Sequence, residues 1–165
     1  MPPARSSPSA PHRSVVASAS SFSAPLSSKR SADYPTKLLV PKNGAHFTTL
    51  LPSIIEAFDY DGTVSNRRLV TTSGGIPDGS CLDLEGYLWN AVWDSYRVER
   101  YSPKGQLDGV IDVPIRKPTC VAFGGRDLST LFKTSSRAGE DEEQLLKEPE
   151  AGGLYAIDVG VRGSC

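Results

Sequence analysis

The sequence predicts an all-β fold preceded by a disordered tail. Short runs of apolar, aromatic and β-branched residues recur between residues 54 and 159, each bounded by Gly, Pro, Asn or Asp. Such spacing is typical of a β-sandwich or a β-propeller. Two pairs of runs repeat at an offset of about 40 residues, the length of one propeller blade, so the repetition favours a propeller. The pairs are Cys81–Asp83 with Leu88–Trp93, and Val121–Phe123 with Thr130–Thr134.

The N-terminal region differs in composition from the rest. Residues 1–31 contain eleven serines and five prolines and no acidic residue. Such a segment cannot bury enough apolar area to offset chain entropy. We expect residues 1–53 to form a disordered or poorly ordered tail, and residues 54–165 to form the folded part. The alternative for the tail is a transit peptide, because a Ser- and Arg-rich, acid-poor start is typical of one, although the prolines oppose an amphipathic helix. The expected location is therefore cytoplasmic, with an organelle as the alternative.

The first expected hairpin begins at Ile54, where the expected tail ends. Ile54–Tyr60 is rich in apolar and aromatic residues, Asp61-Gly62 is a hairpin turn signal, and Arg67–Thr72 returns. The pattern of Lys37–Val40 is compatible with a strand but does not decide the assignment.

The next expected elements surround one carboxylate. Pro77-Asp78-Gly79 predicts a tight turn before a short strand, Ser80–Asp83. Glu85-Gly86 predicts the next turn. Leu88–Trp93 is apolar on both faces apart from Asn90, which indicates a strand sandwiched between layers.

The C-terminal third continues the pattern and adds one helix. Arg97–Tyr101 alternates, with Arg97 and Glu99 expected outward and Val98 inward. A short helix within residues 139–147 is acidic at its start and is followed by Pro149; we expect a solvated excursion held by Leu145 and Leu146. The remaining expected strands are Leu107–Val113, Thr119–Phe123, Thr130–Thr134 and Leu154–Val159.

Charge and cysteine content narrow the class of function. Residues 1–55 carry six basic side chains and one acidic one, so the remainder, with 12 basic and 18 acidic side chains, is mildly acidic. This argues against nucleic acid as a partner. No apolar run approaches the roughly 20 residues of a membrane helix, so no membrane association is expected. Three cysteines without metal-type spacing fit reduced thiols.

Seven motifs occur in order along the second part of the chain. They are Ala57–Asp61, Ser65–Arg68, Gly75–Gly79, Asp83–Trp89, Arg97–Tyr101, Pro118–Gly125 and Pro149–Tyr155. Together they resemble the C-terminal part of the senescence-marker-protein/gluconolactonase/regucalcin family, over about residues 56–163. The resemblance implies a partial six-bladed β-propeller of about two and a half blades, with a divalent cation at its central channel. It also implies hydrolysis of sugar lactones such as gluconolactone, or calcium binding as in regucalcin-like members.

The resemblance also assigns candidate site residues. It implies that Asp78 is both a metal ligand and the general base that takes a proton from the attacking water. On residues alone, Asp78 is a turn aspartate bonded to its own backbone. Asn43 is the candidate for a second metal ligand. The implied cation is calcium or zinc, with magnesium or manganese as alternatives. The family's early Glu and the residues that position its sugar have no counterpart here, so the particular lactone stays open.

Other conspicuous residues have structural interpretations. Asp83 is expected to cap a turn, and Trp89 and Trp93, on one face of a strand, to pack in the core. Cys120 is expected to be a small buried hydrophobe. His12 and His46 lack a Ser or Cys partner in a motif, so a nucleophilic triad has no support.

The resulting hypothesis is metal-dependent hydrolysis of a small sugar lactone, impaired in this chain because one carboxylate cannot replace the water shell of a cation. The alternatives are a calcium-binding protein without hydrolase activity, and a non-catalytic propeller remnant. A partial ring has open strand edges, through which the chain could self-associate.

Overall fold

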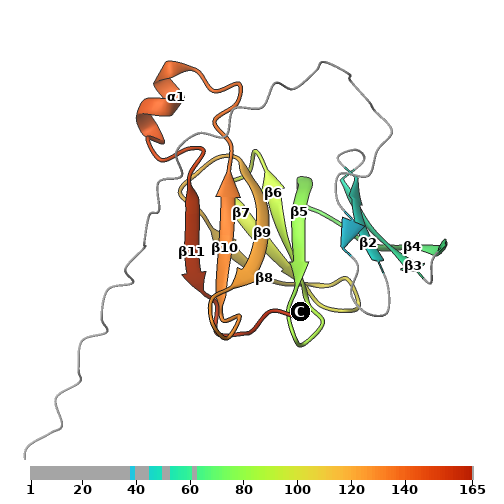
Figure 1. The fold of residues 1–165 in the computed structure, drawn as a ribbon. Helices are drawn as coiled ribbons and strands as arrows, with labels where there is room; N and C mark the ends of the chain where they lie inside the picture. Colours follow the sequence, from blue (N-terminus) through green and yellow to red (C-terminus); the bar gives the residue numbers. More distant parts are fainter. Residues whose placement is uncertain (1–37, 40–44, 50–52, 61–62, 165) are drawn as a thin grey trace, which may run out of the picture.

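The computed structural model describes residues 38–39, 45–49, 53–60 and 63–164, and Figure 1 shows their arrangement. Within these residues the chain forms three antiparallel sheets and one short helix. The predicted all-β class is confirmed. Most of the predicted tail, and Asn43 with it, lies outside the described residues.

The first sheet has the order β1-β2-β3-β4. The predicted pairing of the strands on either side of Asp61-Gly62 is present, with two irregularities in its register. Strand pairing also extends upstream of the expected start at Ile54, because β2 pairs with β3 along its whole length. The strands are β1 Leu38–Leu39, β2 Ala45–Thr49, β3 Ile54–Tyr60 and β4 Val64–Thr72.

The second sheet is a meander with the order β5-β6-β7-β8. The predicted turn at Glu85-Gly86 is present: Gly86 has a φ of 80° and its N–H donates to the Asp83 carbonyl at 3.0 Å. Leu88–Trp93 is buried on both faces over most of its length, as its apolar pattern predicted. The strands are β5 Ile76–Leu82, β6 Leu88–Trp93, β7 Arg97–Tyr101 and β8 Leu107–Asp112.

One prediction in this sheet is wrong. Pro77-Asp78-Gly79 is not a turn ahead of a strand; it lies inside β5. The register moves from Pro77 opposite Val92 to Ser80 opposite Asn90, so β5 carries one extra residue, which is a β-bulge. Pro and Gly are tolerated in strands at such points, because the ladder is already interrupted there.

The third sheet has the order β11-β10-β9, and β9 lies against β5 and β6 of the second sheet. A bridge between Asp83 and Gly163 joins the end of the described chain to the residue that follows β5. The strands are β9 Pro118–Gly124, β10 Thr130–Ser135 and β11 Leu154–Asp158.

The predicted helix is present as α1, Glu142–Lys147, between β10 and β11. Of the two leucines expected to hold it, Leu145 is half-buried, whereas Leu146 is 82% exposed. Polar contacts also hold the helix: Gln144 donates to the Tyr96 hydroxyl at 3.0 Å, and the Glu148 carboxylate accepts from the Arg116 N–H at 2.9 Å. Within the described residues, no helical segment has the length and apolar character of a membrane span.

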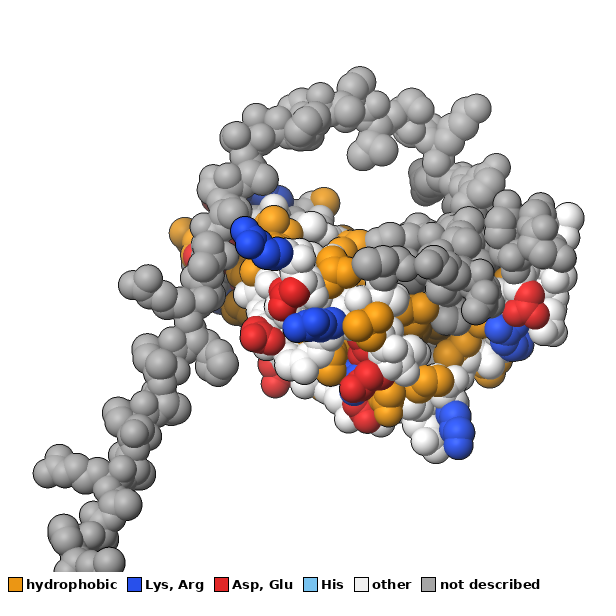
Figure 2. Space-filling view, turned by 60° about the horizontal axis from the view of Figure 1, so that its bottom comes forward, with side chains coloured by type: hydrophobic (Ala, Val, Ile, Leu, Met, Phe, Trp, Pro, Cys, Tyr) orange, Lys and Arg blue, Asp and Glu red, His pale blue; other side chains and the backbone are white. Residues whose placement is uncertain are grey.

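Two apolar clusters join the sheets. The larger lies between the second and third sheets and is formed by Trp89, Ala91, Val98, Val121 and Leu131. The smaller contains Ile55, Leu88 and Tyr101 and joins the first sheet to the second. The second sheet is therefore covered on both faces. On the face brought forward in Figure 2, acidic and basic side chains are interspersed with hydrophobic ones.

Candidate functional site

Asp78 lies on the bulge of β5, and its backbone is held by the next strand. Asn90 of β6 is fully buried; its side-chain amide donates to the Asp78 carbonyl at 3.0 Å and to the Ser80 hydroxyl at 2.6 Å. Both bonds cross the bulge, where the regular ladder is broken. Asn90, the exception in the apolar pattern of its strand, thus fixes the backbone that carries the candidate carboxylate.

The third sheet holds the bulge from the other side. A Cβ atom built on Gly79 would lie 2.6 Å from the Cys120 sulfur and 2.7 Å from the Cys120 Cα, so only glycine fits. Cys120 is half-buried rather than buried as expected, and it packs at this contact. Asp78 itself is half-buried, and the contacts of its two neighbouring strands fix its backbone.

Asp78 alone does not form a metal centre. Within the described residues, no group of three or more His, Cys, Asp or Glu side chains converges in a way that could hold a cation. Ca²⁺ takes six to eight oxygen ligands, so the described residues do not fit it without further donors. Neither role of Asp78, nor the ligand role of Asn43, is tested by this arrangement.

Asp83 has the structural role that the sequence predicted, and it is completely buried. Its Oδ1 accepts from the N–H groups of Glu85 and Tyr87, at 3.0 and 2.9 Å. Its Oδ2 accepts from the Trp89 indole at 2.9 Å and from Arg100 Nη2 at 2.7 Å. Every side of the carboxylate is occupied, which leaves it unsuited to act as a metal ligand.

Trp89 follows the prediction of core packing: it is 5% exposed and meets Phe123 edge to face, with ring centroids 6.1 Å apart. Trp93 does not, because it is half-buried and belongs to neither apolar cluster. It lies at the end of β6, beneath the Lys117 ammonium, which is 5.5 Å from its ring centroid.

Sequence reasoning missed a buried polar cluster on the other face of the second sheet. Glu99 was expected to point outward but is 2% exposed, because the start of the β4–β5 connection covers it. Its carboxylate accepts from the Ser73 hydroxyl at 3.0 Å, from Arg97 Nε at 2.8 Å, and from the Tyr101 hydroxyl. Burial, together with the adjacent Glu99 carboxylate, raises the pKa of Tyr101 to about 12. A strand that alternates in sequence can be buried on both faces, so the pattern carried no signal for this cluster.

Lys133 was missed for the same reason. It lies in the middle strand of the third sheet, 4% exposed, with its ammonium 4.1 Å from the centroid of the Tyr155 ring. Within the described residues its Nζ has no hydrogen-bond partner. Burial lowers the pKa of Lys133 to about 8.

Comparison with known proteins identifies the protein family of this chain. The family model described as the SMP-30/Gluconolactonase/LRE-like region matches residues 45–137. The chain therefore belongs to the SMP-30/gluconolactonase/LRE-like family, which confirms the resemblance seen in the motifs. The match begins upstream of Glu56 and ends before the Pro149–Tyr155 motif.

Individual relatives carry the name regucalcin. Regucalcin of Bos taurus is 43% identical over 117 residues, which are 66% of this chain and 39% of that protein. Regucalcin of Danio rerio is 41% identical over 126 residues, 72% of this chain and 43% of that protein. The chain thus spans about two fifths of the length of these relatives.

Solved structures of other proteins have a similar fold. A calcium-binding protein, regucalcin, from Agrobacterium tumefaciens superposes with a TM-score of 0.70 at 29% identity, over 74% of this chain and 44% of that one. A gluconolactonase from Xanthomonas campestris superposes with a TM-score of 0.60 at 24% identity, over 78% of this chain and 39% of that one; this likeness concerns the fold alone.

Proposed function

We propose that the chain carries the Asp78-bearing part of a metal-dependent sugar-lactone hydrolase of the gluconolactonase type. The observation that carries the proposal is the fixed bulge of β5 within a member of this family. Asn90 and the Gly79–Cys120 contact hold its backbone, and Asp78 is half-buried rather than enclosed in the core. Pre-organisation of this kind is what a reacting group requires.

The chemistry assigned to Asp78 is that of a general base. Hydrolysis of a lactone needs a water whose proton is removed as its oxygen attacks the carbonyl carbon, and a carboxylate within hydrogen-bond reach can take that proton. A divalent cation of the family, calcium, zinc, magnesium or manganese, would polarise the carbonyl oxygen. Asp78 would be one of its ligands, and the other ligands would come from outside the described residues.

The proposed architecture is a partial six-bladed propeller. The first two sheets have four strands each and the third has three among the described residues, and each sheet packs on the next. This packing supports blades arranged around a channel that β5 and β9 would line. The chain spans about two fifths of its relatives, so we expect it to bind metal weakly and to turn over lactone slowly when tested alone.

The test combines a metal titration with a lactone assay. Calorimetry with Ca²⁺, Zn²⁺, Mg²⁺ and Mn²⁺ should show no site of micromolar affinity, and any gluconolactone hydrolysis should be slow, need millimolar metal and disappear in Asp78→Asn. The matched control is Asp127→Asn, which removes an exposed carboxylate of the β9–β10 connection and should leave the rate unchanged. Micromolar metal binding with fast, metal-dependent turnover would contradict the expected impairment, whereas equal activity in both variants would remove Asp78 from the mechanism.

A calcium-binding protein without hydrolase activity is the second candidate. It is favoured by the relatives named regucalcin and by the neighbour described as a calcium-binding protein. Saturable Ca²⁺ binding without turnover would select it. The absence of both, with oligomers that form as the concentration rises, would select a non-catalytic remnant that associates through open strand edges.

A further inference from the structure

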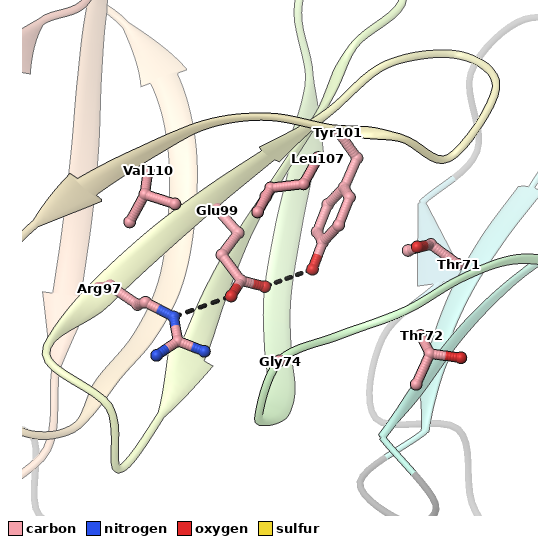
Figure 3. A pocket seen from close by; sticks show the side chains of 8 residues that line it. All are labelled: Thr71, Thr72, Gly74, Arg97, Glu99, Tyr101, Leu107 and Val110. Atoms are coloured by element: carbon pink, nitrogen blue, oxygen red, sulfur yellow. Dashed lines mark hydrogen bonds and ion pairs between the residues drawn. The ribbon is translucent and has the colours of Figure 1, made fainter.

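A cavity of about 480 Å³ lies between the first and second sheets and is lined from β4, β7 and β8 (Figure 3). Its volume is in the range of small-molecule sites, roughly 300–1,000 Å³. In the second sheet, β6 separates β5 from β7, so the cavity lies toward the opposite sheet edge from Asp78. All of its described lining residues fall between Thr71 and Val110.

The charged hydrogen-bonding group left in this cavity is a donor, the Arg97 guanidinium, beside the Thr71 and Thr72 hydroxyls, which can donate or accept. Glu99 already accepts from three donors, the Ser73 and Tyr101 hydroxyls and Arg97 Nε. The hydrogen bond from Arg97 Nε to Glu99 fixes one edge of the guanidinium. Within the described residues, the two terminal amino groups of Arg97 make no hydrogen bond, so they can bind a ligand. Gly74 leaves them room, since a Cβ atom there would lie 2.7 Å from Arg97 Nη2. A ligand for this cavity must therefore present acceptors.

The wall beside Glu99 and Tyr101 is aliphatic, because Val110 and Leu107 of the adjacent strand β8 are their cross-strand partners. Leu107 and Val110 of β8 are 56% and 48% exposed, and both line the cavity (Figure 3). Exposed aliphatic groups beside a cavity gain free energy when a ligand covers them, about 25 cal/mol per Å² of apolar surface. The complementary ligand has an apolar part as well as an acceptor.

We propose that this cavity binds a small organic carboxylate, with its carboxylate on the terminal amino groups of Arg97 and its aliphatic part against Leu107 and Val110. Arg and carboxylate pair through parallel charge-assisted hydrogen bonds. Among the described residues that line the cavity, Arg97 is the one cation, and the buried Glu99 carboxylate stands next to it. The Arg97–Glu99 pair is neutral as a whole, so the ligand carboxylate is held by hydrogen bonds to the terminal amino groups rather than by net charge. Phosphate, with a larger charge and no apolar surface, fits this wall less well.

The test titrates the full chain with sodium butyrate and monitors binding by the backbone amide chemical shifts. Acetate and inorganic phosphate are the comparison probes. We expect saturable millimolar butyrate binding, with shifts at residues 71–74 and 97–110. Arg97→Gln should weaken it by about tenfold or more, the loss of one charge-assisted pair. The matched control is Arg68→Gln on β4, which removes an arginine with its own carboxylate partner, Asp59, outside the cavity, and should change nothing.

Two further variants keep the test decisive if Arg97→Gln fails to fold. Gly74→Ala retains every charge but places a methyl group where Arg97 Nη2 lies, and it should also weaken butyrate. Leu107→Ser should abolish the preference for butyrate over acetate. The proposal is overturned by an absence of saturable butyrate binding, by equal affinities in the Arg97 and Arg68 variants, or by phosphate that binds as tightly as butyrate.

Discussion

At the scale of single residues, the buried charges separate according to whether they have partners. Asp83 accepts five hydrogen bonds from four residues, and Glu99 accepts three. The Lys133 ammonium meets only an aromatic face among the described residues. A buried charge is tolerated when it is paired and is costly when it is not, so these residues should respond to substitution in opposite directions.

Asp83→Asn should destabilise the chain by about 3–5 kcal/mol, because it leaves the Arg100 guanidinium, which is 14% exposed, without its buried partner. The matched control is Asp108→Asn, since Asp108 contacts the same Arg100 but is 40% exposed. That control should cost about 1 kcal/mol or less. Urea denaturation measures both, and equal losses would show that Asp83 has no special structural role.

Lys133→Met should stabilise the chain at pH 7, by about 2 kcal/mol, because it removes a buried charge without a hydrogen-bond partner. The pKa of Lys133 is lowered from 10.5 in the unfolded chain to about 8 in the folded one. Between these values the unfolded state holds a proton that the folded state has lost, so the Lys133 contribution to stability rises with pH across that window.

The difference in unfolding free energy between wild type and Lys133→Met, measured by urea denaturation from pH 7 to 10.5, isolates this contribution. The advantage of the Met variant should shrink steadily as the pH rises. The control is Lys104→Met, at a lysine in the exposed turn between β7 and β8. A difference that stays constant with pH would show that Lys133 titrates normally.

At the scale of elements, the bulge of β5 shows how three strands specify one backbone. Pro77 and Gly79 suit a break in the ladder, Asn90 supplies the hydrogen bonds that the break removes, and Cys120 lies too close for any side chain at position 79. The sequence motif predicted the importance of this segment but assigned it to a turn. Pro and Gly favour turns and bulges alike, and only pairing with β6 separates the two.

Gly79→Ala should destabilise the chain by about 1–3 kcal/mol or more, because its methyl group would overlap backbone as well as side-chain atoms of Cys120. Gly109→Ala is the matched control, since Gly109 also lies in a strand but has nothing within 4 Å of the added Cβ. Thermal unfolding compares them. A melting temperature for Gly79→Ala as high as that of Gly109→Ala would mean that β9 does not press on the bulge.

At the scale of the whole molecule, packing between sheets is what buries the polar clusters. The second sheet is covered on one face by the third sheet and on the other by the first, and each interface has its own apolar cluster. The same arrangement leaves the cavity between β4 and the last two strands of the second sheet, β7 and β8 (Figure 3). Its carboxylate ligand and the self-association of open edges are both proposals about surfaces that this stacking creates.

Local patterns in the sequence were sufficient for the all-β class, for the strands after residue 54 apart from the start of β5, for the short helix and for the family. They depend on turn residues, on hydrophobic alternation and on motifs, all of which are readable over a few neighbouring positions. Asp78 as the candidate site residue also came from such a motif, and its chemical role remains a prediction.

The tertiary structure alone decided which faces are buried. Glu99 and Lys133 lie in strands whose alternation cannot reveal that a second layer covers them. The bulge at Asp78, the contact between Gly79 and Cys120, and the Arg97 cavity each join residues from different strands. Burial and strand pairing depend on contacts between segments that are distant in sequence, whereas secondary-structure patterns depend on neighbouring residues. For that physical reason the sequence predicts most strands, and only the tertiary structure shows which of their faces are buried.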